Sequence, residues 1–208
     1  MARIGVIVLA AGRSTRFLGR EPSKLVAPVD GAPLVRRAVS AAMDADVGDV
    51  VVVTGARAAD VEAALAGLSV RIVNAPRFAE GVAYSLRRGI EAVRDTDAVL
   101  IALGDQPAVR PDAYRRVAAR WRVSGASIIV PRYAGSTALA HPVLFAAPMY
   151  PELLALEGDV GARSVITREP SRVIEEPLDW PVPRDVDTVE DLEALATSRS
   201  ASNIHDQR

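Results

Sequence analysis

Short runs of apolar residues recur along the first half of the chain with little polar alternation. Four of them, rich in Val and Ile, cover residues 4–9, 50–53, 70–73 and 98–103. Apolar runs of this length with little polar alternation are typical of strands that are buried on both faces of a parallel sheet. We therefore expect these segments to form buried parallel strands.

Between these runs, apolar residues recur at steps of three and four, which is the spacing of one helix face. Such stretches cover residues 33–44, 58–65 and 82–93. A further helix over 111–122 opens on a proline, which suits a first helical turn, and a strand over 126–130 follows it. The alternation predicts an α/β fold, namely a single-domain, Rossmann-like, doubly wound and mostly parallel sheet.

The pattern changes after residue 130. Residues 131–151 contain four prolines, a Gly-Ser-Thr turn and the short apolar run 143–146. This composition predicts a hairpin or insertion over the sheet in place of another crossover. A last helix is expected to open at residues 187–192. Residues 1–197 would then form one domain, and the polar stretch 198–208 a disordered tail.

Composition narrows the choice of compartment and partners. The 208 residues are half hydrophobic, and 25 Lys and Arg stand against 26 Asp and Glu, so no basic field attracts nucleic acid or a membrane. The absence of cysteine and the short apolar N-terminal run predict a cytoplasmic protein. Only two histidines occur, so we expect carboxylates as the metal ligands.

The first predicted strand leads into a loop of small and basic residues. It reads Leu-Ala-Ala-Gly-Arg-Ser-Thr-Arg-Phe-Leu-Gly over residues 9–19, and Ser-Lys-Leu follows at 23–25. Small residues let backbone amides turn inward as an anion nest, and Arg13, Arg16 and Lys24 add the cations that a triphosphate requires. The loop is neither a P-loop nor a dinucleotide fingerprint. A surface loop with solvated arginines is the alternative.

Two acidic segments provide candidate metal ligands. The sequence Leu-Gly-Asp-Gln-Pro over 103–107 puts Asp105 at the carboxyl edge of a strand, where open α/β sheets bind ligands. Mg²⁺ usually takes one or two carboxylates together with substrate phosphates. Asp185 and Asp187 would point to the same side of an extended segment, so either could reach the ion. Turn formation by Asp105 and helix capping by Asp187 are the local alternatives.

The loop over 9–25 resembles the signature of the MobA-like nucleotidyltransferases, a family that includes the molybdenum cofactor nucleotidyltransferases. The resemblance implies the nucleotide-diphospho-sugar transferase-like fold and phosphate binding by Arg16 and Lys24. It also implies CTP in preference to GTP, because the loop reads Leu-Ala-Ala-Gly, and a metal at Asp105 and Asp187. The implied nucleotide-binding residues in this loop are Leu9, Ala10, Ala11, Gly12, Arg13 and Ser14.

Three further segments are similar to the cytidylyltransferase-like subgroup of that family. Gly81 and Ser85, in Gly-x-x-x-Ser-Leu, would face the nucleotide. His141 in Ala-His-Pro, and Asp159 and Arg163 in Gly-Asp-Val-Gly-Ala-Arg, would border the acceptor pocket. Taken without the resemblance, the same residues fit a glycine turn, an ordinary helical serine and a histidine that hydrogen-bonds within the hairpin.

These residues together predict a Mg²⁺- or Mn²⁺-dependent enzyme that transfers CMP from CTP to a phosphorylated acceptor. Molybdopterin is the leading acceptor, with methylerythritol phosphate, phospholactate and sugar phosphates as rivals, and a molybdoenzyme or its maturation factor as a possible partner. Catalysis would rest on alignment and charge neutralisation by Lys24, Arg16 and Asp105. Lys24 is expected at the surface of the cleft. A non-catalytic nucleotide-binding maturation partner is the alternative.

Overall fold

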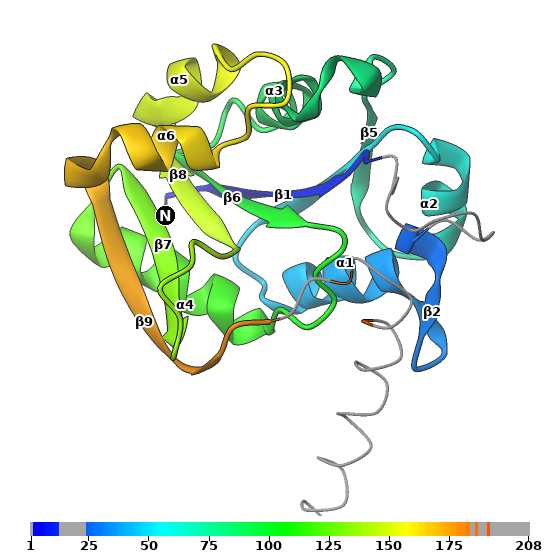
Figure 1. Ribbon diagram of the computed structural model, residues 1–208, viewed down its shortest axis with the longest axis horizontal. Coiled ribbons are helices and arrows are strands. Elements are labelled where there is room, and N and C mark those ends of the chain that lie inside the picture. The colour runs from blue at the N-terminus through cyan, green and yellow to red at the C-terminus, as the bar shows by residue number, and fades with distance from the viewer. Residues whose placement is uncertain (1, 13–23, 184–185, 187–190, 192–208) are drawn as a thin grey trace, which may run out of the picture.

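A seven-stranded sheet forms the centre of the molecule, in the order β5-β4-β1-β6-β8-β7-β9 (Figure 1). The computed structural model describes residues 2–12, 24–183, 186 and 191. The strands of the sheet are β1 (Ile4–Ala10), β4 (Asp49–Thr54), β5 (Arg71–Asn74), β6 (Ala98–Leu103), β7 (Ile128–Ala134), β8 (Val143–Ala146) and β9 (Val173–Pro181). A separate two-stranded ribbon joins β2 (Pro28–Val29) to β3 (Ala32–Pro33).

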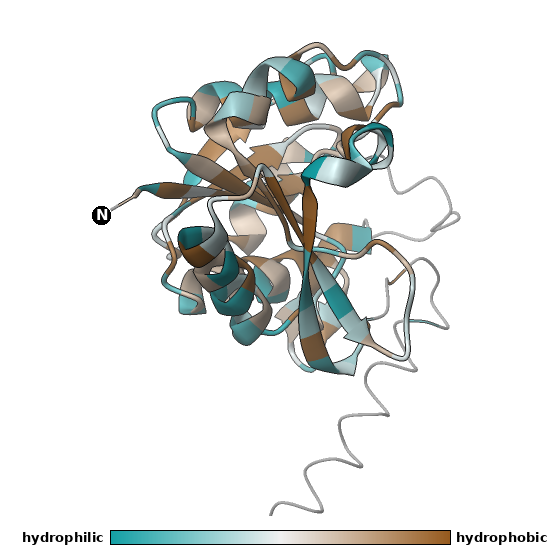
Figure 2. Cartoon of the chain, turned by 90° about the vertical axis from the view of Figure 1, so that its left-hand side faces the viewer, coloured by the Kyte–Doolittle hydropathy of each residue, from teal (hydrophilic) through white to brown (hydrophobic). Residues whose placement is uncertain are grey.

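Helices cover both faces of the sheet (Figure 1). They are α1 (Leu34–Asp44), α2 (Ala58–Ala64), α3 (Val82–Ala92), α4 (Pro111–Ser124), α5 (Tyr150–Leu154) and α6 (Arg163–Arg168). Val6 and Val8 of β1 pack in one core with α1, α2 and α4, whereas Ile7 packs in a second core with α3, α5 and α6. Successive strand residues point to opposite faces, so both faces of β1 are buried, and Figure 2 shows the apolar strands between the helical layers.

The pairing of the strands confirms the predicted doubly wound and mostly parallel sheet. β1 runs parallel to β4 and β6, β4 runs parallel to β5, and β7 runs parallel to β9. β8 is antiparallel to both of its neighbours, β6 and β7. Parallel neighbours need crossover connections, which the helices provide on both faces.

Two details of the sequence prediction are wrong. The hairpin of β7 and β8 does not lie over the sheet, because β8 is inserted into it between β6 and β7 and all four of its residues are buried. The run at 70–73 is not buried on both faces, because β5 forms an edge and its residues are half-buried or exposed.

Three elements of the second half were not predicted. α5 and α6 have five and six residues, which is too short for a helical period to show. β9 is an edge strand whose side chains are mostly exposed or half-buried, so its sequence is polar and interrupted by prolines. The predicted helix at 187–192 and the tail at 198–208 fall outside the described residues apart from Asp191, and the domain boundary at 197 stays a prediction.

No helix in the described ranges combines the length and the apolar character that a membrane span requires.

Candidate active site

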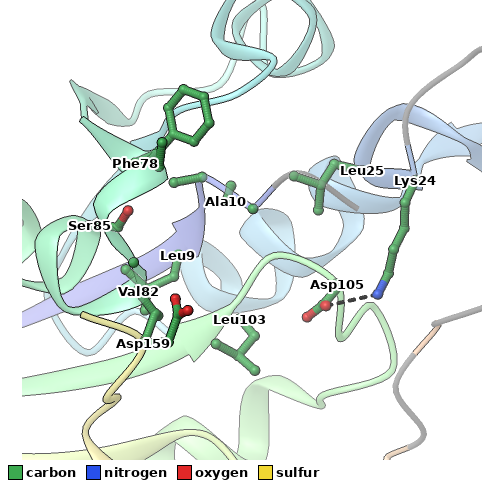
Figure 3. Close-up of a pocket in the computed structure, with 14 residues that line it drawn as sticks. Leu9, Ala10, Lys24, Leu25, Phe78, Val82, Ser85, Leu103, Asp105 and Asp159 are labelled. Atoms are coloured by element: carbon green, nitrogen blue, oxygen red, sulfur yellow. Dashed lines mark hydrogen bonds and ion pairs between the residues drawn. The ribbon is translucent and has the colours of Figure 1, made fainter. Parts of the chain in front are cut away.

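The carboxyl ends of β1 and β6 lie side by side, with Leu9 paired to Leu103. A pocket of about 530 Å³ opens at this edge of the sheet (Figure 3). Its size is within the usual range for small-molecule sites. Of the residues predicted for the site, it brings together Leu9, Ala10, Ala11, Gly12, Lys24, Gly81, Ser85, Asp105 and Asp159.

One end of this pocket carries an ion pair between Lys24 and Asp105. The Lys24 Nζ lies 3.0 Å from Oδ2 of Asp105. Lys24 lines the pocket as predicted, but it is only 5% exposed, so the expectation that it would behave as an ordinary exposed residue is wrong. The cause is the 3-10 helix η1 (Lys24–Val26), in which Leu25 packs into the core beside α1 and carries the lysine inward.

Asp105 is placed by the turn that follows β6. The amide of Gly104 donates to the carbonyl of Leu9 over 2.9 Å, and a β-carbon on Gly104 would lie 3.1 Å from that of Ala10. A larger residue at 104 would therefore press against the end of β1. The turn leaves the Asp105 side chain about one-third exposed at the pocket, with 32% of its surface accessible.

The backbone of Asp105 also contacts the segment that carries the second predicted metal ligand. The amide of Val186 donates to the Asp105 carbonyl over 3.4 Å, and Val186 is buried in the core. Asp185 and Asp187, its neighbours in sequence, lie outside the described residues. Among the residues described, no three His, Cys, Asp or Glu side chains are grouped as a metal cage.

The other end of the pocket is formed by the start of α3 and the segment at 158–159. Gly81 has a φ of 114°, and a β-carbon there would lie 2.2 Å from the backbone carbonyl of Gly158. The amide of Ala83 donates to that carbonyl over 3.1 Å. Glycine is therefore required at 81 for both its conformation and this close approach. Ser85, one turn further along α3, is buried and lines the pocket.

Apolar side chains line the space between the two ends. Sequence reasoning missed Leu25, Phe78, Ala79, Val82 and Leu103 as lining residues. Each is a common residue type without a motif of its own. Phe78 and Val82 lie close to Gly81 in sequence, and Leu103 lies two residues before Asp105. Their closeness in sequence to predicted site residues is the one feature that could have identified them as lining residues.

Of the three residues predicted to bind an acceptor, only one lines the pocket. Asp159 lines the pocket with the predicted nucleotide-binding residues, whereas His141 and Arg163 do not line it. The Tyr133 hydroxyl donates to the His141 carbonyl over 2.7 Å, within the β7–β8 hairpin. Burial lowers the pKa of His141 to about 4, the Asp105 charge opposes this shift, and the Arg163 charge adds to it. His141 is therefore neutral near pH 7.

Four predicted site residues, Arg13, Ser14, Arg16 and Asp187, fall outside the described residues. Their roles stay predictions.

Comparison with known proteins identifies related sequences over most of the chain. The family described as MobA-like NTP transferase domain matches residues 6–173. Nicotine blue oxidoreductase from Paenarthrobacter nicotinovorans is 32% identical over 197 residues, which cover 91% of this chain and 94% of that protein. The chain also matches bifunctional GlmU proteins, of whose length it spans about a quarter.

Solved structures with the same fold include two that share more than a quarter of their residues with this chain. A nucleotidyl transferase from Methanothermobacter thermautotroptrophicus superposes with a TM-score of 0.80 at 27% identity, covering 96% of this chain and 99% of its own. Rv0371c from Mycobacterium tuberculosis, in complex with manganese, gives a TM-score of 0.78 at 30% identity, covering 95% of this chain and all of its own. Both similarities extend over nearly the whole of this chain.

Proposed function

Because the chain belongs to the MobA-like NTP transferase family, we propose that it transfers CMP from CTP to a phosphorylated acceptor and releases pyrophosphate. The observation that carries the proposal is the pairing of Lys24 with Asp105 at one end of an otherwise largely apolar pocket. A cation for phosphate and a carboxylate for a metal ion stand at the carboxyl edge of the sheet, where α/β folds bind ligands.

In this reaction an oxygen of the acceptor phosphate attacks the α-phosphorus of CTP. The new P–O bond forms as the bond to the bridging oxygen of the β-phosphate breaks, and pyrophosphate leaves with that electron pair. The acceptor phosphate is already ionised at neutral pH, so no general base is needed. The Lys24 ammonium neutralises charge at the α-phosphate, and Arg16 and the backbone of residues 9–14 hold the departing pyrophosphate.

The residues at the pocket fit a divalent ion that is shared with substrate. Asp105 offers a partly exposed carboxylate, and the amide of Val186, whose sequence neighbours are Asp185 and Asp187, donates to the Asp105 carbonyl. Mg²⁺ and Mn²⁺ accept one or two carboxylates and complete their shells with phosphate oxygens and water. When bound there, such an ion supplies Lewis-acid polarisation of the phosphoryl oxygens. The manganese complex of Rv0371c supports a divalent ion in this fold.

For the acceptor, we propose a molybdopterin-type phosphate. The support is the resemblance of the segments around His141 and Arg163 to the cytidylyltransferase-like subgroup. The charges of Asp105 and Arg163 both act on His141, although neither His141 nor Arg163 lines the pocket. A neutral imidazole can donate one hydrogen bond to an acceptor without adding charge.

A second candidate function is a nucleotide-dependent redox reaction. The observation that favours it is the oxidoreductase from Paenarthrobacter nicotinovorans, which matches this chain over nearly its full length. A pocket with a cation at one end and apolar walls suits the pyrophosphate and ring of a redox dinucleotide as well as those of an NTP.

One experiment separates the two candidates. The purified chain is incubated with each of the four NTPs, Mg²⁺ and candidate phosphorylated acceptors, and pyrophosphate release is measured. We expect release with CTP, at a kcat/KM well above that for GTP. A preference for GTP would refute the base assignment. No release with any NTP, together with acceptor-dependent oxidation of a reduced nicotinamide dinucleotide, would replace the transferase proposal with the redox one.

A further inference from the structure

The two ends of the pocket differ in charge. Figure 3 shows the ion pair of Lys24 and Asp105 at one side and Asp159 at the other, beside Val82. The Asp105 charge is compensated by Lys24. Within the described parts of the chain, no hydrogen bond or ion pair engages the Asp159 carboxylate, and the residue is exposed to the pocket. Among the residues that the structure describes, the Asp159 carboxylate at this end therefore has no paired cation.

The backbone holds Asp159 in this position. The carbonyl of Gly158 accepts the Ala83 amide over 3.1 Å, and the Asp159 amide nitrogen would lie only 2.7 Å from a β-carbon built on Gly81. Asp159 thus lies against the first turn of α3, an 11-residue helix whose N-terminal dipole favours a carboxylate. The backbone at Asp159 is therefore held beside α3 by contacts that need no substrate.

An ionised carboxylate only accepts hydrogen bonds. It repels phosphate, which at neutral pH offers acceptor oxygens and negative charge. A nucleotide that enters the pocket with its phosphates at Lys24 presents donors at the far end only through its nucleoside, either from ribose hydroxyls or from an exocyclic amine. The Asp159 carboxylate therefore favours the nucleoside half of the nucleotide at this end and disfavours a nucleotide bound with its phosphates there.

We propose that Asp159 binds the nucleoside of the NTP, by accepting hydrogen bonds from donor groups on its ribose or base. This rests on the proposed nucleotidyltransferase function and changes the role of Asp159 from acceptor binding to nucleotide selection.

Calorimetry of nucleotide binding, with Mg²⁺ and without any acceptor, tests the assignment. Asp159→Asn should weaken CTP binding about tenfold to a hundredfold, as expected for loss of a hydrogen bond to a charged group. Glu157→Gln is the matched control, because Glu157 is an exposed carboxylate on the same segment that does not line the pocket. It should leave CTP affinity unchanged.

Two further ligands identify the donor. If the cytosine amine is the donor, UTP binds more weakly than CTP to the wild type and its affinity is insensitive to Asp159→Asn. If a ribose hydroxyl is the donor, Asp159→Asn weakens the binding of UTP as much as that of CTP. The affinity for 2′,3′-dideoxy-CTP, which lacks these hydroxyls, is then the same for wild type and variant. Equal CTP affinity for wild type and Asp159→Asn would overturn the inference alone. Failure of the wild type to bind any NTP would overturn the proposed function and the inference together.

Discussion

The ammonium of Lys24 lies 3.0 Å from Oδ2 of Asp105, and the lysine side chain is 7% exposed whereas the aspartate side chain is 32% exposed. The two groups assigned to phosphate and metal therefore neutralise each other before a ligand binds. A metal–nucleotide complex that binds here must either contact both groups while they remain paired or break the ion pair between them. Substitution of either residue is consequently expected to change the stability of the fold as well as ligand binding.

Asp105→Ala should abolish most Mg²⁺-dependent CTP binding and lower the free energy of unfolding by about 1 to 3 kcal/mol, because it removes a charged partner from the buried Lys24. Asp105→Asn is the matched variant. Its amide oxygen can still accept from Lys24, so it should retain more stability while losing the metal-binding charge. Calorimetry with CTP and Mn²⁺, beside urea unfolding, measures both effects. If Asp105→Ala binds metal and CTP like the wild type, Asp105 is no metal ligand.

Replacing Lys24 should reduce kcat by a factor of ~10² to 10³, the usual effect of removing one preorganised group that stabilises transition-state charge. Lys24→Ala also deletes a buried aliphatic stem, which contributes about 0.8 kcal/mol per methylene. Lys24→Met retains most of that stem and should unfold at a higher temperature than Lys24→Ala. The two variants should be equally slow. A well-folded Lys24→Met with normal kcat would remove the lysine from the mechanism.

The sequence predicted the sheet well because its central strands are long apolar runs whose signal does not depend on tertiary contacts. It also indicated residues that line the pocket, because Asp105 follows a predicted strand and Gly81 precedes a predicted helix. The burial of Lys24 was not predictable, because it depends on Leu25 packing beside α1. The insertion of β8 into the sheet and the approach of Asp159 to Gly81 are contacts between segments distant in sequence, which no local pattern encodes.

His141 should make the fold sensitive to mild acid. Its pKa is lowered from 6.5 to about 4 in the folded state, mainly by burial. As the pH falls below about 6.5, His141 is therefore protonated in the unfolded chain while it is still neutral in the folded protein. The stabilising contribution of neutral His141 is fully present above that pH and is lost progressively as pH falls toward 4.

Urea unfolding of wild type and His141→Gln between pH 7.5 and 4.5 measures this effect. The wild type should lose more stability than the variant over that range. An NMR titration of His205→Gln, in which His141 is the one remaining histidine, should show a midpoint well below 6.5. An ordinary midpoint near 6.5 would show that the pKa of His141 is not lowered by desolvation in the folded state.

Gly81→Ala should weaken both the fold and nucleotide binding. At a φ of 114° an alanine is strained, and its β-carbon would lie 2.2 Å from the Gly158 carbonyl, so the segment that carries Asp159 must move away from α3. We expect a loss of about 1 to 3 kcal/mol in the free energy of unfolding together with a drop in CTP affinity. Gly125→Ala is the control, because Gly125 also has a positive φ, of 63°, but a β-carbon there meets no atom within 4 Å. That variant should lose stability through backbone strain alone and bind CTP normally. If Gly81→Ala binds CTP as tightly as Gly125→Ala does, contact between α3 and the 158–159 segment does not position the nucleotide site.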